Sequence, residues 1–257
     1  MPLGLLEKLH RALAQTDVSG FVRRRRVYRL AGDAPPVPVL QRLSVSLSEL
    51  SHALLPVGDI AASRAVARYV GESIDRRLLA LLAPVDGDLS GIGPVALPMT
   101  LSTLMSDAFR RFDEQMFRVR RNAIVLEISL TDIFDNIEDS CFACRFVRHR
   151  GYGICLVGAD LRLVAAIDWS RLCFDYAAVH GDATPPSTPR AAAPVNRLAS
   201  AVERIGAARL ILTGADSGTA VAAGTAAGVE LFLGRHVEDL HREHTRRRRL
   251  RAGLRRD

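Results

Sequence analysis

The chain has 257 residues, of which 48% are hydrophobic and 25% are charged. It can therefore bury a sizeable core and is not disordered as a whole, and its length fits one large barrel or two small domains. Four Cys residues do not predict a disulfide framework, no run approaches the roughly 18 apolar residues of a membrane span, and the amphipathic start lacks the apolar core of a secretory signal. We therefore expect a cytoplasmic, reduced protein without a transmembrane segment.

The net charge of +7 is concentrated at the end of the chain. Residues 241–257 contain eight Arg against Glu243 and Asp257, which leaves +1 for the rest of the chain. The only lysine is Lys8. The body is thus nearly neutral, and the basic character belongs to a C-terminal helix or tail.

The first half of the chain alternates expected helices and strands. Residues 40–47 alternate apolar and polar side chains, as a half-buried strand does, and Asp59 is a candidate cap for the helix that follows. Residues 32–38 contain three prolines and predict a turn or loop. We expect helices at 3–15, 61–82 and 106–119, and strands at 27–30, 40–47, 95–99 and 122–128.

The second half continues the alternation. Its strand segments are apolar, which fits burial on both faces of a sheet. We expect strands at 153–157, 172–179, 209–213 and 229–233, and helices at 132–150, 195–205, 217–227 and from about His236 onward.

Strands that alternate with helices of a dozen or so residues predict βα units and a parallel sheet. About eight strands at this length fit an α/β (β/α)₈ barrel better than an open sheet. We divide the chain into an N-terminal helix and linker (1–21), a barrel (22–238) and a basic C-terminal helix or tail (239–257).

The order and character of the segments over residues 22–238 resemble the EAL domain, the phosphodiesterase barrel of cyclic di-GMP signalling. Glu127 lies in one of the most similar segments, and Asp216 in another. The stretches that carry the resemblance are 106–113 with 124–128, 151–156 with 173–176, and 210–216 with 226–235.

The resemblance implies two divalent metals held by acidic residues, a metal-activated water and a nearby lysine. Only Glu127 keeps an expected ligand type, and Asp216 is a conservative partner at a loop position. The lysine position falls at Ala178. The other positions that the resemblance assigns to signature, metal-binding or clamping residues hold different side chains, at Arg42, Leu43, Ser44, Ser46, Pro98, Val157, Gly158, Thr213 and Leu233.

The sequence therefore predicts a degenerate EAL-like barrel that is not an enzyme, with no metal, no cofactor and no binding of cyclic di-GMP in the usual mode. Glu127 and Asp216 are expected to be vestigial metal-ligand positions. The resemblance implies a regulatory module of bacterial signalling that acts through a protein partner and forms a homodimer.

Two alternatives remain open. The barrel mouth could bind cyclic di-GMP or another nucleotide in an altered mode, or the tail could contact nucleic-acid phosphates, an anionic membrane or an acidic protein. The candidate anion or partner contacts of the tail are Arg246, Arg247, Arg248, Arg249 and Arg251.

Three smaller motifs favour structural roles. Cys141 and Cys144 fall one turn apart inside an expected helix and are predicted to be small buried residues. The histidines after residue 235 lack a further obvious metal ligand. The turn 214–219 opens a helix that either Asp216 or Ser217 could cap, and its amides could also receive a phosphate.

Overall fold

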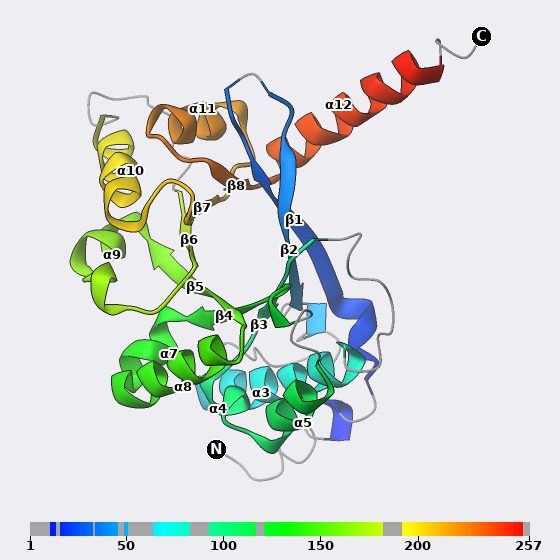
Figure 1. Cartoon of the computed structure of the whole chain (residues 1–257), viewed down its shortest axis with the longest axis vertical. Helices are drawn as coiled ribbons and strands as arrows, with labels where there is room; N and C mark the ends of the chain where they lie inside the picture. Colours follow the sequence, from blue (N-terminus) through cyan, green and yellow to red (C-terminus); the bar gives the residue numbers. More distant parts are fainter. Residues whose placement is uncertain are drawn as a thin grey trace. The chain divides into compact units, whose positions relative to one another are not determined.

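A computed structural model describes residues 11–13, 16–32, 34–45, 49–50, 64–82, 93–116, 121–181 and 192–253. Within them, eight strands form a sheet that closes into a barrel in chain order (Figure 1). The predicted α/β barrel is therefore confirmed. The strands are β1 (Val22–Arg29), β2 (Val37–Val45), β3 (Val95–Pro98), β4 (Ile124–Ser129), β5 (Gly153–Asp160), β6 (Tyr176–His180), β7 (Leu210–Thr213) and β8 (Leu231–Leu233).

The helices lie mostly between successive strands, as the alternating pattern predicts. The helix expected at 3–15 falls largely outside the described residues. Within this range the structure describes residues 11–13, which are helical. The described elements are the 3₁₀ helices η1 (Val18–Phe21) and η4 (Trp169–Arg171), and α3 (Arg64–Leu82), α4 (Leu101–Leu104), α5 (Asp107–Gln115), α7 (Leu130–Asp135), α8 (Ile137–His149), α9 (Leu161–Ala166), α10 (Ala192–Ile205), α11 (Gly218–Ala226) and α12 (Arg235–Gly253).

The expectation of an all-parallel sheet is wrong at β1. This strand pairs antiparallel with β8, so that Tyr28 lies opposite Phe232. Only residues 30–36 connect β1 to β2. A parallel crossover needs a dozen or more residues, so this connection reverses the direction of the chain.

Several expected boundaries also differ: β1 and β2 begin at Val22 and Val37, earlier than the predicted 27 and 40, and two larger differences lie in the second half of the chain. The helix predicted at 132–150 is split into α7 and α8 at Asn136. The backbone of Asn136 is extended, and its side-chain oxygen accepts a hydrogen bond from the Asp139 N–H. Asn136 therefore caps the start of a new helix, α8. The strand predicted from residue 172 begins at Tyr176. The preceding residues form α9 and η4, capped by Asp160 and Asp168 respectively.

The chain divides into two compact units, and each has its own packing. Unit 1 comprises residues 1–24, 42–128 and 132–153, and unit 2 comprises residues 25–41, 129–131 and 154–257.

Unit 1 contains a cluster built on one face of α3. Val66, Val70, Ile74 and Leu78 recur every four residues and pack with Leu50, and also with Leu13. This spacing places the apolar side chains on one stripe of the helix, which leaves the polar residues of α3 for contacts with α4.

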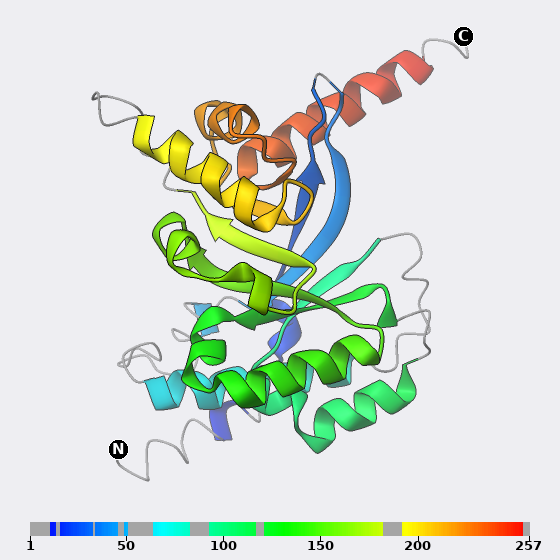
Figure 2. The same cartoon turned by 60° about the vertical axis from the view of Figure 1, so that its left-hand side comes forward.

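Unit 2 is built on the apolar strands β6, β7 and β8, with α9, α10 and α11 packed outside them (Figure 2). Helix α11 approaches the sheet closely at Gly224. A Cβ atom there would lie 2.5 Å from the Phe232 ring and 2.8 Å from Leu212. The small residues of α11 therefore let the helix pack against these strands.

Candidate functional site

Glu127 lies on β4 in unit 1, and its carboxylate is engaged by Arg42 of β2. The Arg42 Nη2 donates to Glu127 Oε2 at 2.7 Å, and Arg42 Nε donates to Oε1. The Glu127 side chain is 2% exposed and that of Arg42 is 21% exposed. The guanidinium fork thus satisfies both carboxylate oxygens in a mostly buried place.

The neighbouring strand adds no metal ligand beside Glu127. Pro98 is the in-register partner of Glu127 across β3 and β4, and its side chain has no donor atom. Arg42 stands at the position where the resemblance implies the signature glutamate. A positive guanidinium there replaces the charge of a cation, so these three residues do not fit a divalent metal site.

In unit 2 the strand positions that the resemblance assigns to site residues carry aliphatic or weakly polar side chains. Ala178 is buried on β6, next to Ile211 in the β6–β7 register. Thr213 ends β7, donates from Oγ1 to the Val179 carbonyl at 3.2 Å, and lies opposite Leu233. These positions offer neither an ammonium group nor a carboxylate.

The positions expected to hold paired aspartates have an irregular backbone. Val157 and Gly158 fall in a register shift of the β5–β6 pair, between Leu156 and Ala159. Gly158 has a φ of +88°, a conformation that favours glycine. An aspartate at residue 158 would therefore be strained in this backbone.

Asp216 follows β7 and contacts the start of α12. Its Oδ1 accepts the Arg235 backbone N–H at 2.7 Å, and the Arg25 guanidinium lies 3.8 Å away. A carboxylate at this place stabilises the N-terminus of a helix. The adjacent Ser217 caps α11 by accepting the Ala220 N–H at 3.2 Å.

The arginines of the predicted basic helix lie on α12. Arg246, Arg247, Arg248 and Arg249 are exposed, and Arg247 pairs with Glu243 one turn earlier. Arg251 lies within the bounds of the same helix. The expected basic C-terminal helix is therefore present, beginning one residue before His236.

The remaining motifs have structural surroundings. The His241 Nδ1 lies 2.9 Å from the Pro36 carbonyl, and its ring packs on Tyr28 at 5.0 Å. Cys141 and Cys144 lie on α8 and form no disulfide within the described residues, with Cys144 buried and Cys141 half-buried. In the described part of the chain, no group of three or more His, Cys, Asp or Glu side chains could hold a metal ion.

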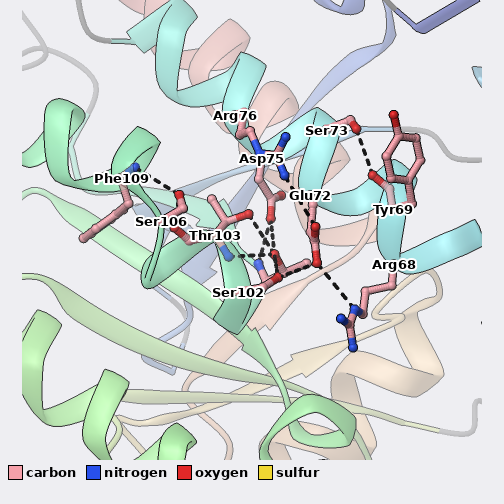
Figure 3. A network of polar contacts seen from close by, with 11 residues as sticks. Arg68, Tyr69, Glu72, Ser73, Asp75, Arg76, Ser102, Thr103, Ser106 and Phe109 are labelled. Atoms are coloured by element: carbon pink, nitrogen blue, oxygen red, sulfur yellow. Dashed lines mark hydrogen bonds and ion pairs between the residues drawn. The ribbon is translucent and has the colours of Figure 1, made fainter. Parts of the chain in front are cut away.

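A polar network between α3 and α4, which sequence reasoning missed, lies beside a cavity of unit 1 (Figure 3). Asp75 accepts hydrogen bonds from the Thr100 N–H at 2.7 Å and from Thr100 Oγ1 at 2.9 Å. Burial raises the pKa of Asp75 to about 6 despite these hydrogen bonds. Glu72, one turn earlier, accepts from Ser102 Oγ at 2.7 Å.

The three-residue spacing of Glu72 and Asp75 is the one sequence signal for this network. It predicts that both side chains share a face of α3, but their partner residues, 25 and 30 positions later, follow only from the packing.

No protein-family model and no curated protein sequence matches the chain. Its fold matches solved EAL domains. The FimX EAL domain of Xanthomonas citri in complex with c-diGMP is 12% identical, with a TM-score of 0.61 over 90% of each chain. That of FimX from Pseudomonas aeruginosa bound to c-di-GMP is 15% identical, with a TM-score of 0.60 over 90% of this chain and 93% of that one.

The EAL enzyme Bd1971, in a form bound to cAMP and cyclic-di-GMP, is 14% identical, with a TM-score of 0.62 over 90% of this chain and 65% of that one. At these identities the likeness establishes an EAL-like barrel fold. Within the described residues, no helix combines the length and apolar content needed to cross a bilayer.

Proposed function

We propose that this chain is a non-catalytic EAL-like module of cytoplasmic bacterial signalling, which regulates a protein partner and does not hydrolyse cyclic di-GMP. The observation that carries the proposal is the Arg42–Glu127 pair. It engages the one carboxylate that keeps an expected ligand type, and it does so from the position of the expected signature glutamate.

The chemistry of hydrolysis supports the same conclusion. Two-metal hydrolysis needs several carboxylates to hold the cations and a bridging water as nucleophile. Arg42 brings a positive charge instead, and Ala178 cannot supply the lysine that the resemblance implies. Glu127 and Asp216 are, on this proposal, vestigial ligand positions that now serve ion pairing and helix capping.

A hydrolysis assay tests the proposal directly. The full chain is incubated with cyclic di-GMP and Mg²⁺ or Mn²⁺, and the linear dinucleotide is measured by chromatography. We expect no product above the buffer control. A linear product that disappears in the Glu127→Gln variant would overturn the proposal.

A second candidate function is a nucleotide receptor, which the ligands of the structural neighbours favour. The two FimX structures and the Bd1971 form contain c-di-GMP or cyclic-di-GMP. Calorimetry with cyclic di-GMP, with and without Mg²⁺, separates the two functions. Binding of cyclic di-GMP tighter than about 10 µM without hydrolysis would favour the receptor function. The absence of any heat of binding would favour the module that acts through a protein partner.

A further inference from the structure

The last turns of α12 carry a concentrated positive charge. Residues 246–249 are four consecutive arginines, and all four are exposed. The sequence has no acidic residue between Glu243 and Asp257, and Arg251 adds to the same stretch. A second run of four arginines, residues 23–26, lies on β1, where ion pairs engage part of it. The end of α12 is therefore the basic surface that is most open to an anionic partner.

The first half of α12 is fixed to unit 2. Val237 is fully buried, the His241 Nδ1 lies 2.9 Å from the Pro36 carbonyl, and the His241 ring packs on Tyr28. Figure 1 shows the last turns of the helix extending past α11, which belongs to the same unit. Arginines in the last turns of a helix also interact favourably with its dipole. The charged end is thus a preformed helix, which loses little conformational entropy when a partner binds.

Most of these charges lack a counter-charge among the residues that the structure describes. Arg246, Arg248 and Arg249 form no ion pair there, and Arg247 pairs with Glu243, one turn earlier in the same helix. Like charges one turn apart repel each other, and a partner that presents several anionic groups removes this repulsion. The helix end therefore complements a polyanion.

The four arginines point to all sides of the helix. An α-helix turns by about 100° per residue, so residues 246–249 together cover roughly 300° of its circumference. Arg246 and Arg248 lie on opposite sides, roughly 200° apart. Arg247 and Arg249 are opposed in the same way. A flat anionic surface reaches one side of such a helix, whereas a groove with anionic walls reaches both.

Duplex DNA offers a groove of this kind. Its major groove is about 12 Å wide and admits an α-helix between two walls of phosphates. We propose that the end of α12 enters the major groove of double-stranded DNA and holds the chain there through contacts of its arginines with phosphates. Leu250, which is 59% exposed, adds an apolar side chain that can contact a thymine methyl group.

Other anionic partners complement this helix less well. An amphipathic helix binds a membrane through an apolar face, but Leu250 is the one apolar residue among residues 242–251. Single-stranded nucleic acid binds by stacking its bases on aromatic rings, and the sequence from residue 235 onward has no Phe, Tyr or Trp. The major groove of duplex RNA is too deep and narrow for side chains to read.

The proposal concerns α12 alone, so it holds whether or not the chain hydrolyses cyclic di-GMP. Fluorescence anisotropy of the full chain with a labelled duplex of about 20 base pairs, two helical turns, tests it. We expect a Kd on the order of 1–100 µM at about 0.15 M salt. The logarithm of affinity should fall with the logarithm of salt with a slope of about −3 to −4, because each neutralised phosphate contributes about −0.9. No binding, or binding that salt does not weaken, overturns the proposal.

Two single variants test the groove itself. Arg246→Gln and Arg248→Gln remove charges from opposite sides of the helix and introduce a good helix former at exposed positions. In a groove, each change is expected to weaken binding roughly five- to tenfold at about 0.15 M salt and to make the slope shallower by about one. An effect of only one of the two variants indicates a flat partner and refutes the groove.

The matched control carries the same loss of charge elsewhere in unit 2. Arg162→Gln and Arg197→Gln alter exposed positions on α9 and α10, and each is expected to bind DNA like the wild type. Losses as large as those on α12 would show general charge attraction and overturn the proposal. Far-UV circular dichroism confirms that every variant keeps the helical content of the wild type.

Two competitors decide the class of partner. A single strand of the same length and vesicles that contain anionic lipid are each added to the labelled complex. We expect unlabelled duplex to displace the labelled duplex at lower concentration than either competitor. Displacement by the single strand or by the vesicles at the same concentration of negative charge as the duplex contradicts the assignment to double-stranded DNA.

Discussion

The Arg42–Glu127 pair predicts an asymmetric response to removal of its two partners. Arg42→Met would leave the Glu127 carboxylate, 2% exposed, without a counter-charge. Breaking a buried ion pair in this way costs roughly 3–5 kcal/mol. Glu127→Gln instead leaves Arg42, which is 21% exposed and reaches water, so we expect a smaller loss of about 1–2 kcal/mol.

Replacing both partners removes the uncompensated charge. The double variant Arg42→Met with Glu127→Leu is expected to be close to the wild type in stability, because apolar side chains of similar size often substitute for a buried pair without loss. The double-mutant cycle, completed by the single variant Glu127→Leu, should therefore give a coupling free energy above about 1 kcal/mol.

Urea unfolding followed by circular dichroism measures the free energies of unfolding of the wild type, of the three single variants and of the double variant. A loss for Arg42→Met no larger than that for Glu127→Gln would refute the argument from burial. Additive losses in the cycle would show that the two side chains do not act as a pair in solution.

Three further predictions concern metal, pH and the tail. Arg42→Glu places a second carboxylate beside Glu127, so we expect this variant to have a lower melting temperature than the wild type. Mn²⁺ should raise the melting temperature of the variant but not that of the wild type. An equal effect of Mn²⁺ on both proteins would contradict the assignment of Arg42 to a metal-ligand position. Burial raises the pKa of Asp75 from 3.8 to about 6, so the folded state binds its proton more tightly than the unfolded state, and the free energy of unfolding should fall between about pH 4 and pH 6. In Asp75→Asn that fall should shrink by an amount on the order of 1–3 kcal/mol, as measured by urea unfolding across this pH range, and an unchanged pH profile would exclude Asp75 as its source. If the tail binds nucleic acid, deletion of residues 245–257 should abolish retention on a DNA column and its steep salt dependence, whereas persistent retention would place any such binding elsewhere.

Much of the barrel follows from local patterns. The apolar segments around residues 124–128 and 210–213 and the amphipathic spacing of α3 identify strands and helices because side-chain periodicity is a local property. The sequence also shows that Pro98 cannot supply a metal ligand from its side chain and that Ala178 cannot supply an ammonium group, because residue type alone decides this chemistry.

Other features depend on which distant residues meet. Periodicity does not show backbone conformation or connection length. The helix break at Asn136 and the start of α9 depend on the first, and the antiparallel direction of β1 depends on the second. Asp75 has a raised pKa only because packing buries it beside Thr100.

The candidate site shows the division most clearly. Sequence alone predicted, through the resemblance, that Arg42 stands at the position of an expected carboxylate and that Glu127 keeps an expected ligand type. Only the tertiary structure decided that these two residues, 85 positions apart, form an ion pair with each other. Arg42 lies on β2 and Glu127 on β4, with β3 between them in the sheet, so their contact depends on how the sheet curves into a closed barrel, which local composition and spacing do not show.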